Sequence, residues 1–273
     1  MENLVYHYTS LEAMKGIIGT DLCLWATRYD HLNDPHEQIW ADEMVSVYCE
    51  KHYVSKDYTL NDLKTMVAKY SYILSLCEIP DYRNMWRLYC NDGLGICIGL
   101  DADELSRISC ENSYRDPKHH YEVFESVLYS SKKDIVNAVN YWKQEETFNR
   151  NPDEPEEELM SMRAFIKDED FDIEHEIRYA CIRENEKVVM SPSDGNNMVY
   201  IKAYEDTKEV KYRRRGEEEI VPYLELHFPC NIIKSIIVGY QYEFEKAKAI
   251  IENHLRLYSD SYNHVKIIKS SLY

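Results

Sequence analysis

The sequence predicts one α+β domain over residues 1–273, with a mostly helical insertion around residues 102–167. Short apolar or alternating segments, typical of strands, are interspersed with segments that carry apolar residues at helical spacing. No Gly/Ser/Pro-rich linker or internal repeat divides the chain, and its eight glycines and eight prolines are too few for a fold dominated by loops. Hydrophobic residues make up 44 %, enough for a sizeable core. The elements are therefore expected to pack around one core.

The first elements are a strand, a helix and a second strand. Residues 4–8 are expected to form the first strand. Thr9 is the expected N-cap of the helix, because Glu12 follows three residues later as in a capping box. Apolar residues at helical spacing follow over residues 11–18, and Gly19 is the expected stop. Residues 22–27 predict the second strand.

Later segments continue this mixture. Helices are expected over residues 36–53 and 63–70, with a short helical stretch over 81–89 and an amphipathic helix over 243–255. The remaining strands are expected over residues 72–77, 95–100, 121–129, 176–182, 198–203, 220–228, 232–238 and 265–268.

One basic cluster interrupts an acidic chain. Residues 211–215 read Lys-Tyr-Arg-Arg-Arg, and three glutamates at 217–219 offset their charge, so we interpret the cluster as a solvated turn before a strand. The alternative is a local basic rim that attracts an anionic target. The formal net charge of −17 gives the chain as a whole no attraction for nucleic acid or an anionic membrane.

The sequence favours a cytoplasmic protein with no membrane association and no metal. Its N-terminus lacks the basic and apolar regions of a signal peptide, and no apolar run approaches the roughly 18 residues of a membrane span. The eight cysteines include no C-x-x-C pair. They are therefore expected to be reduced thiols and not metal ligands.

Standard nucleotide-binding and hydrolase motifs are missing from the sequence. It has no G-x-x-x-x-G-K-[ST] loop and no G-x-G-x-x-G after a strand, so no glycine-rich loop can cradle a phosphate. It also has no G-x-S-x-G and no H-E-x-x-H. A bound nucleotide would need another kind of site.

Three segments carry residues suited to such a site. In residues 6–9, His7 stands between tyrosines and could hydrogen-bond a ribose hydroxyl, or it could be a satisfied core histidine. Trp86 and Tyr89 lie three residues apart on one helix face and could stack on a planar ligand or pack in the core. Residues 174–178 put two glutamates and an arginine on one face of a strand, which is either an exposed face or a charged cleft.

These segments, in this order, resemble the bacterial family known as domain of unknown function 2971. Residues 6–37 resemble its opening Y-H-Y-T-S and L-N-D-P-x-E patterns, residues 75–101 its M-W-x-x-Y and G-x-C-I segment, and residues 174–178 its E-x-E-x-R strand. Residues 222–226 and 232–239 also fit, so the resemblance covers nearly the whole chain. Leu-Cys at 76–77 and Arg-Leu at 87–88 replace common Phe-Ser and Ser-His pairs, which bears on substrate detail more than on fold.

The family resembles the ADP-ribosyltransferase fold in the order of its elements. The resemblance implies a split mixed or antiparallel β-sheet core with flanking helices, and a cleft in which NAD binds as a substrate. It implies that His7 anchors a ribose and that Glu176, on a late strand, is the catalytic glutamate, with Glu174 as a second candidate. A carboxylate there would stabilise the oxocarbenium-like state formed when the nicotinamide–ribose bond breaks, or take a proton from the acceptor.

The resemblance also implies contacts to the rest of the NAD molecule. Trp86 and Tyr89 are candidates for packing on nicotinamide, with Tyr29 as a rival. Arg178 would meet the pyrophosphate or orient Glu176 through a salt bridge. The further residues expected at the cofactor are Tyr8, Thr9, Trp25, Asn33 and Asp34.

The predicted function is an NAD-dependent ADP-ribosyltransferase that modifies a macromolecule, either nucleic acid or protein. It would be a toxin or anti-phage defence effector, with an antitoxin or defence-system component as a partner. Two alternatives stay open. One is a non-catalytic nucleotide or nucleic-acid binding module on the same fold, and the other is an NAD glycohydrolase, which uses water as the acceptor.

Overall fold

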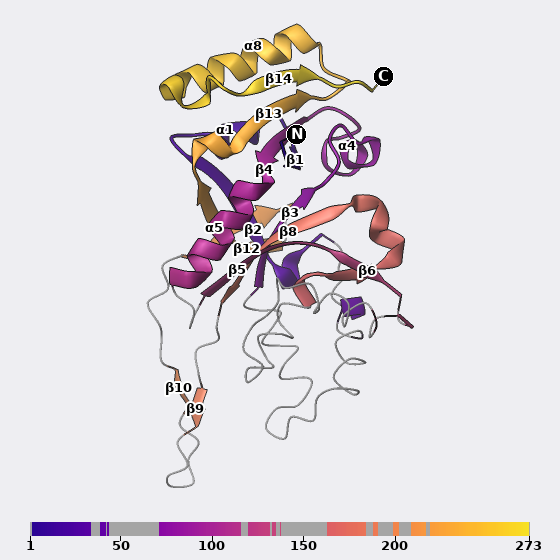
Figure 1. Cartoon of the computed structure of the whole chain (residues 1–273), viewed down its shortest axis with the longest axis vertical. Coiled ribbons are helices and arrows are strands. Elements are labelled where there is room, and N and C mark those ends of the chain that lie inside the picture. Colours follow the sequence, from indigo (N-terminus) through magenta and orange to yellow (C-terminus); the bar gives the residue numbers. More distant parts are fainter. Residues whose placement is uncertain are drawn as a thin grey trace.

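The computed structural model is organised around one ten-stranded sheet (Figure 1). It describes residues 2–33, 39–41, 43, 71–115, 120–131, 133–134, 137, 163–183, 188–190, 199–201, 209–216 and 219–272. The sheet strands are β1 (Leu4–Thr9), β2 (Leu22–Arg28), β3 (Ser71–Cys77), β4 (Ile96–Asp101), β5 (His120–Ser126), β8 (Glu176–Arg183), β11 (Lys211–Arg215), β12 (Glu219–Phe228), β13 (Ile233–Val238) and β14 (Lys266–Lys269). Their order is β11-β12-β2-β3-β1-β4-β13-β14, and β8 and β5 join through β3.

The sheet is mostly antiparallel, in agreement with the predicted α+β class. Only β13 and β14 pair in parallel among its described strand pairs. Two small sheets lie apart from it. The strands β9 (Val188–Met190) and β10 (Val199–Ile201) form one, and β6 (Leu128–Ser130) and β7 (Ile166–Asp168) form the other.

The basic cluster is a strand, so the prediction of a solvated turn is wrong. Residues 211–215 form the edge strand β11, which pairs residue by residue with β12. The alternation of the cluster explains this. Arg213 and Arg215 are partly covered on one face, while Tyr212 and Arg214 are exposed on the other. Residues 211–215 alternate between covered and exposed side chains, as in a strand, but their charges suggested an exposed turn.

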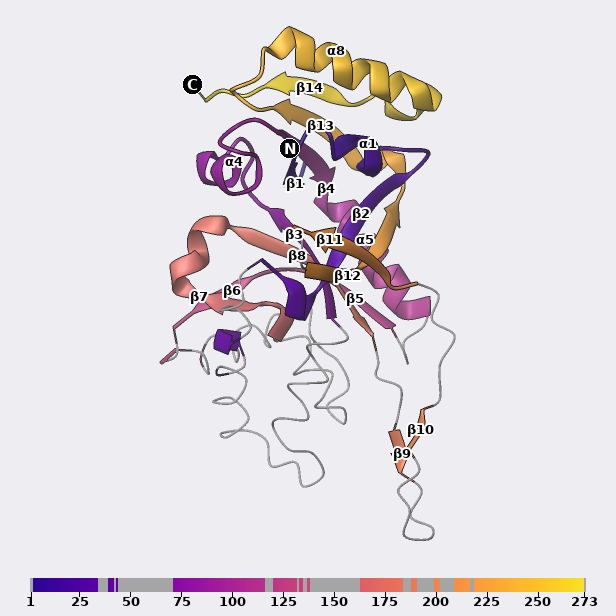
Figure 2. The same ribbon diagram turned by 180° about the vertical axis from the view of Figure 1, so that it is seen from behind.

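Helices flank the sheet on both sides (Figures 1 and 2). They are α1 (Met14–Ile17), α4 (Arg83–Tyr89), α5 (Ala102–Arg115) and α8 (Phe244–Leu255). The predicted helix 243–255 is confirmed, and α8 buries an i, i+4, i+8 stripe of Ala247, Ile251 and Leu255. No helix in the described part of the chain is long and apolar enough to cross a membrane. The predicted helix 63–70 and most of 36–53 lie outside the described residues.

The predicted capping box at Thr9 is wrong. Thr9 is the last residue of β1, and the helix α1 starts only at Met14. The side chain of Ser10 takes the capping position, because its Oγ accepts a hydrogen bond of 3.0 Å from the backbone N–H of Ala13. The side chain of Thr9 is thereby left to line the cavity described below.

The strand expected over residues 121–129, within the segment 102–167, is found as β5 and β6. The segment begins with the 14-residue helix α5. The chain then returns to the main sheet as β5, which pairs with β8 over seven registered positions from His120↔Arg183 to Ser126↔Ile177. The described part of this segment therefore contributes directly to the central sheet, and residues 138–162 lie outside the description.

The sheet splits at β3, and this split positions the site. β8 pairs with one edge of β3 over the whole length of β3. On the other edge β2 pairs only at the start, with Thr27 opposite Ile73, and β1 only at the end, with Tyr6 opposite Cys77. The middle of β3 therefore faces an opening between β1 and β2. Ser75 lies at that opening and is the one exposed residue of β3.

Candidate active site

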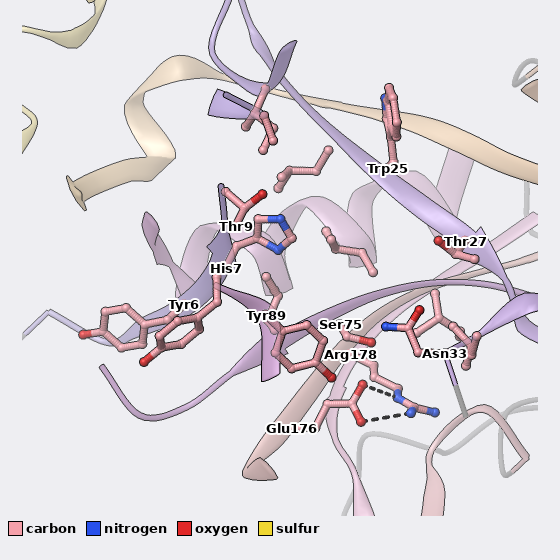
Figure 3. Close-up of a pocket in the computed structure, with 18 of the residues that line it drawn as sticks. Tyr6, His7, Thr9, Trp25, Thr27, Asn33, Ser75, Tyr89, Glu176 and Arg178 are labelled. Carbon is pink, nitrogen blue, oxygen red and sulfur yellow. Dashed lines mark hydrogen bonds and ion pairs between the residues drawn. The ribbon is translucent and has the colours of Figure 1, made fainter. Parts of the chain in front are cut away.

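A cavity of about 520 Å³ occupies the split between β1 and β2 (Figure 3). Such a volume is typical of sites for small molecules and cofactors. Its wall comes from strands that are distant in the sequence. The polar lining residues used below are His7 and Thr9 from β1, Trp25 and Thr27 from β2, Ser75 from β3, Tyr89 from α4, Glu176 and Arg178 from β8, and Arg213 and Arg215 from β11.

Glu176 is a buried carboxylate held by two cations. Arg178 donates from Nε to Oε1 at 2.8 Å and from Nη2 to Oε2 at 2.9 Å, while Lys167 donates from Nζ to Oε2 at 2.9 Å. Burial by itself would raise the pKa of Glu176, but Arg178 and Lys167 together hold this pKa well below its usual value. The carboxylate is therefore ionised at neutral pH and has a fixed orientation.

The arginine and the lysine are fixed in turn. Arg178 is 1 % exposed, and its Nη1 donates to the carbonyl of Ala164 at 2.6 Å. Lys167, on β7, also donates to Glu174 at 2.6 Å. Glu174 ends the 3-10 helix Glu169–Glu174, and His175 then adopts a left-handed conformation before β8 begins. This tight turn brings Glu174 and Glu176 to the ammonium group of Lys167.

Ser75, His7 and Glu176 line the same cavity (Figure 3). Burial lowers the pKa of His7 to about 4, although the backbone of Ser75 opposes this shift. At neutral pH His7 is thus an uncharged imidazole. It can exchange hydrogen bonds with a hydroxyl group at the cavity wall.

The lowered pKa of His7 predicts a pH-dependent stability. Between pH 6.5 and about 4 the unfolded chain binds a proton at His7 that the folded chain does not bind. The folded state therefore loses stability as the pH falls through this window. We expect the free energy of unfolding of the wild type, minus that of His7→Gln, to be constant above pH 6.5 and to decrease below it. Urea unfolding across this pH range measures the difference, and a constant difference would contradict the assignment.

The structure separates the three candidate aromatic residues. Tyr89 ends α4 and lines the cavity. Burial raises the pKa of Tyr89, and the nearby carboxylates of Glu174 and Glu176 raise it further. Trp86 is 0 % exposed and packs edge-on against Tyr8 with ring centroids 5.1 Å apart. Tyr29 is also fully buried. Neither Trp86 nor Tyr29 lines the cavity, so their predicted contact with nicotinamide is replaced by packing in the core.

Trp86 is held in the core by its own polar atom. Its Nε1 donates to Asp81 at 2.9 Å, and Asp81 also accepts hydrogen bonds from Ser270 and Ser271 near the C-terminus. The side chain of Trp86 therefore stays out of the cavity, while Tyr89, at the end of the same helix, reaches it.

The other predicted contact residues are distributed along the cavity. Thr9, Trp25 and Asn33 line it, and Trp25 is 42 % exposed. Tyr8 also belongs to the lining, but its hydroxyl donates to the carbonyl of Ile79 at 2.9 Å and accepts from the N–H of Tyr82 at 2.8 Å. Asp34 lies outside the described residues.

Two arginines of β11 also line the cavity, and they were not among the site residues predicted from the sequence. Arg213 lies over the rings of Trp25 and Tyr223, at 5.2 and 5.9 Å from their centroids, and donates to Thr27 Oγ1 at 2.9 Å. Arg215 donates to the carbonyl of His31 at 2.7 Å. In a strand, residues 213 and 215 share one face, and this spacing was the signal in the sequence that could have placed both arginines toward the cavity.

Comparison with known proteins gives one match. The model of the protein family of unknown function DUF2971 matches residues 85–179, which supports the resemblance stated above. The matched stretch contains Tyr89, Glu174, Glu176 and Arg178, but not His7. No curated protein and no solved structure matches the chain.

Proposed function

We propose that this chain is an NAD-dependent ADP-ribosyltransferase, with an ADP-ribosyltransferase-like split sheet and with its active site in the cavity between β1 and β2. The observation that carries the proposal is that His7 and Glu176 line the same cavity, with Ser75 also on its wall. These are the two residues that the resemblance assigns to the ribose and to the breaking bond. They come from β1 and β8, which β3 separates in the sheet.

The charges around the cavity suit the bond that must break. The nicotinamide–ribose bond cleaves through an oxocarbenium-like state, and an ionised carboxylate close to the ribose stabilises the positive charge that develops. Arg178 and Lys167 keep Glu176 ionised and oriented before the substrate arrives. In the proposed complex, the His7 imidazole binds a ribose hydroxyl and the Tyr89 ring packs on nicotinamide.

The opposite end of the cavity suits the adenosine diphosphate portion of NAD. Trp25 offers a half-exposed ring, and Arg213 and Arg215 supply guanidinium groups at the same end. Guanidinium groups bind phosphate oxygens in a forked geometry, and indole rings stack on planar bases. This division places the anionic phosphates away from Glu174 and Glu176.

The test is incubation of the purified chain with NAD, followed by mass analysis of the products. We expect free nicotinamide and ADP-ribose attached to a nucleic acid or a protein acceptor. Free ADP-ribose in the presence of every acceptor tried would indicate an NAD glycohydrolase instead. An absence of both nicotinamide release and NAD binding would refute the proposal.

A second candidate is a nucleotide-binding module without turnover. It is favoured by one observation, namely that both oxygens of Glu176 already accept hydrogen bonds from Arg178, and one of them also from Lys167. This candidate predicts that NAD raises the melting temperature, because ligand binding stabilises only the folded state. It also predicts that no nicotinamide is released in the same sample.

A further inference from the structure

A second set of ligand-type side chains lies on the strands next to the cavity. In the antiparallel pair of β2 and β12, Cys23 is directly opposite His227, and Glu225 is two residues before His227 on the same face. One ligand atom from each of Cys23, Glu225 and His227 lies within 4.8 Å of the other two. Among the residues that the structure describes, this is the one such group of three.

The histidine of this group is already oriented. Its Nδ1 lies 2.8 Å from Oδ2 of Asp21, and its Nε2 lies 3.7 Å from Oε2 of Glu225. A carboxylate that binds one ring nitrogen fixes the tautomer of a histidine and directs the other nitrogen toward a metal. The Nε2 atom of His227 therefore faces Glu225, one of the other two ligands.

The charges around the thiol favour a bound cation. One carboxylate oxygen of Glu225 lies within 4.8 Å of the Cys23 sulfur, and the carboxylate of Asp21 lies 2.8 Å from His227. Lys211 supplies one positive charge, with its Nζ 2.6 Å from Oε2 of Glu225. The side chain of Lys211 is 42 % exposed, so it can move aside at little cost.

We propose that Cys23, Glu225 and His227 bind a divalent cation of the zinc class. Thiolate and imidazole ligands select zinc over magnesium or calcium, which prefer oxygen ligands. Bonds of about 2.0 Å to nitrogen and oxygen and about 2.3 Å to sulfur require the three side chains to close around the ion. Three protein ligands leave a fourth position open, as in zinc sites that also hold a water or a substrate atom.

The location gives this site a connection to the main cavity. Cys23 and Trp25 both line that cavity, and Glu225 is directly opposite Trp25 in the sheet. The sequence predicts no metal site, because its cysteines include no C-x-x-C pair. Cys23 lies near one end of the chain and Glu225 and His227 near the other, and only the register between β2 and β12 brings them together.

The test uses cobalt(II) as a spectroscopic substitute for zinc, added to the full-length reduced protein. We expect one equivalent of cobalt to produce a thiolate-to-cobalt charge-transfer band, and one equivalent of zinc to remove it. Cys23→Ser should abolish the band. The matched control is Cys110→Ser, which removes an exposed thiol on α5 and should leave the band unchanged.

Two further variants test the roles of the individual groups. His227→Gln should weaken cobalt binding strongly. Asp21→Asn should keep the band but lower the affinity by about 10- to 100-fold, because it alters only the group that orients the histidine. The proposal is wrong if the wild type shows no thiolate band, if the band survives in Cys23→Ser, or if it disappears in Cys110→Ser. None of these readouts depends on NAD or on catalysis.

Discussion

Glu176→Gln is expected to lower the rate of nicotinamide release from NAD by at least about 10²-fold in kcat. The substitution keeps the size of the side chain and an oxygen that can accept a hydrogen bond from Arg178. It removes the negative charge that would stabilise the oxocarbenium-like state. Binding of NAD should survive, because in the proposed complex His7, Tyr89 and the arginines of β11 hold the rest of the molecule.

Two matched variants make this result specific. Glu122→Gln alters another buried carboxylate, one that is 2 % exposed, accepts a hydrogen bond from Asn112 at 2.7 Å and does not line the cavity. It should affect stability but not nicotinamide release. Glu174→Gln distinguishes the two candidate catalytic residues. If Glu174→Gln is inactive and Glu176→Gln is active, Glu174 is the catalytic carboxylate, and if both stay active the assignment of the site is wrong.

Loss of folding is separated from loss of chemistry by the thermal shift with NAD. A Glu176→Gln protein that melts cooperatively and is still stabilised by NAD has kept its cavity. A decrease in nicotinamide release in such a protein then reports on the chemical step. If the NAD-induced shift is lost together with turnover, Glu176 acts in binding, and the catalytic role proposed for it is wrong.

Arg178→Met is expected to lower the free energy of unfolding by about 3–5 kcal/mol, the usual effect of removing one partner from a buried ion pair. The guanidinium group makes two hydrogen bonds to Glu176 and one to the carbonyl of Ala164, and it is 1 % exposed. Without it, Glu176 keeps only Lys167 as a cationic partner, and Lys167 is shared with Glu174. Urea unfolding of both proteins measures the difference.

The pH dependence of this loss has a definite sign. In the wild type the pKa of Glu176 is lowered, so its ion pairs add stability above its ordinary pKa of 4.5, and this stability is lost as the pH falls below it. The difference between the wild type and Arg178→Met should therefore be largest near neutral pH and should shrink in acid. The double variant Arg178→Met/Glu176→Gln should recover part of the loss, because no buried charge is then left without its partner. Equal losses in the single and double variants would contradict the ion-pair explanation.

The strands and the two central site residues could be predicted from the sequence because their signals are local. Alternation and apolar runs identified β1, β2, β3, β4, β8, β12 and β13. The aromatic setting of His7 and the charged face of residues 174–178 singled out both as candidates, with a core or an exposed face as the alternative. The ion pair between Arg178 and Glu176 follows from their spacing, since residues two apart in a strand share a face.

The environment of single side chains could not be predicted in this way. Trp86 and Tyr89 have the same helical spacing in either interpretation, yet the packing of α4 against Tyr8 buries the first and leaves the second in the cavity. Arg213 and Arg215 carry charges that suggested a solvated turn. Their pairing with β12 instead turns Arg213 toward Trp25 and Thr27 and Arg215 toward the carbonyl of His31.

The sequence by itself determined the α+β class and the order of its main elements, because these depend on neighbours within a few residues. It singled out His7 and Glu176 only as candidates. Only the tertiary structure decided that β1 and β2 share one edge of β3 and part at Ser75, which opens the cavity. It also decided that Cys23 meets His227. Strand pairing between distant segments is a long-range choice, made by the packing of the whole sheet, and no local period in the chain encodes it.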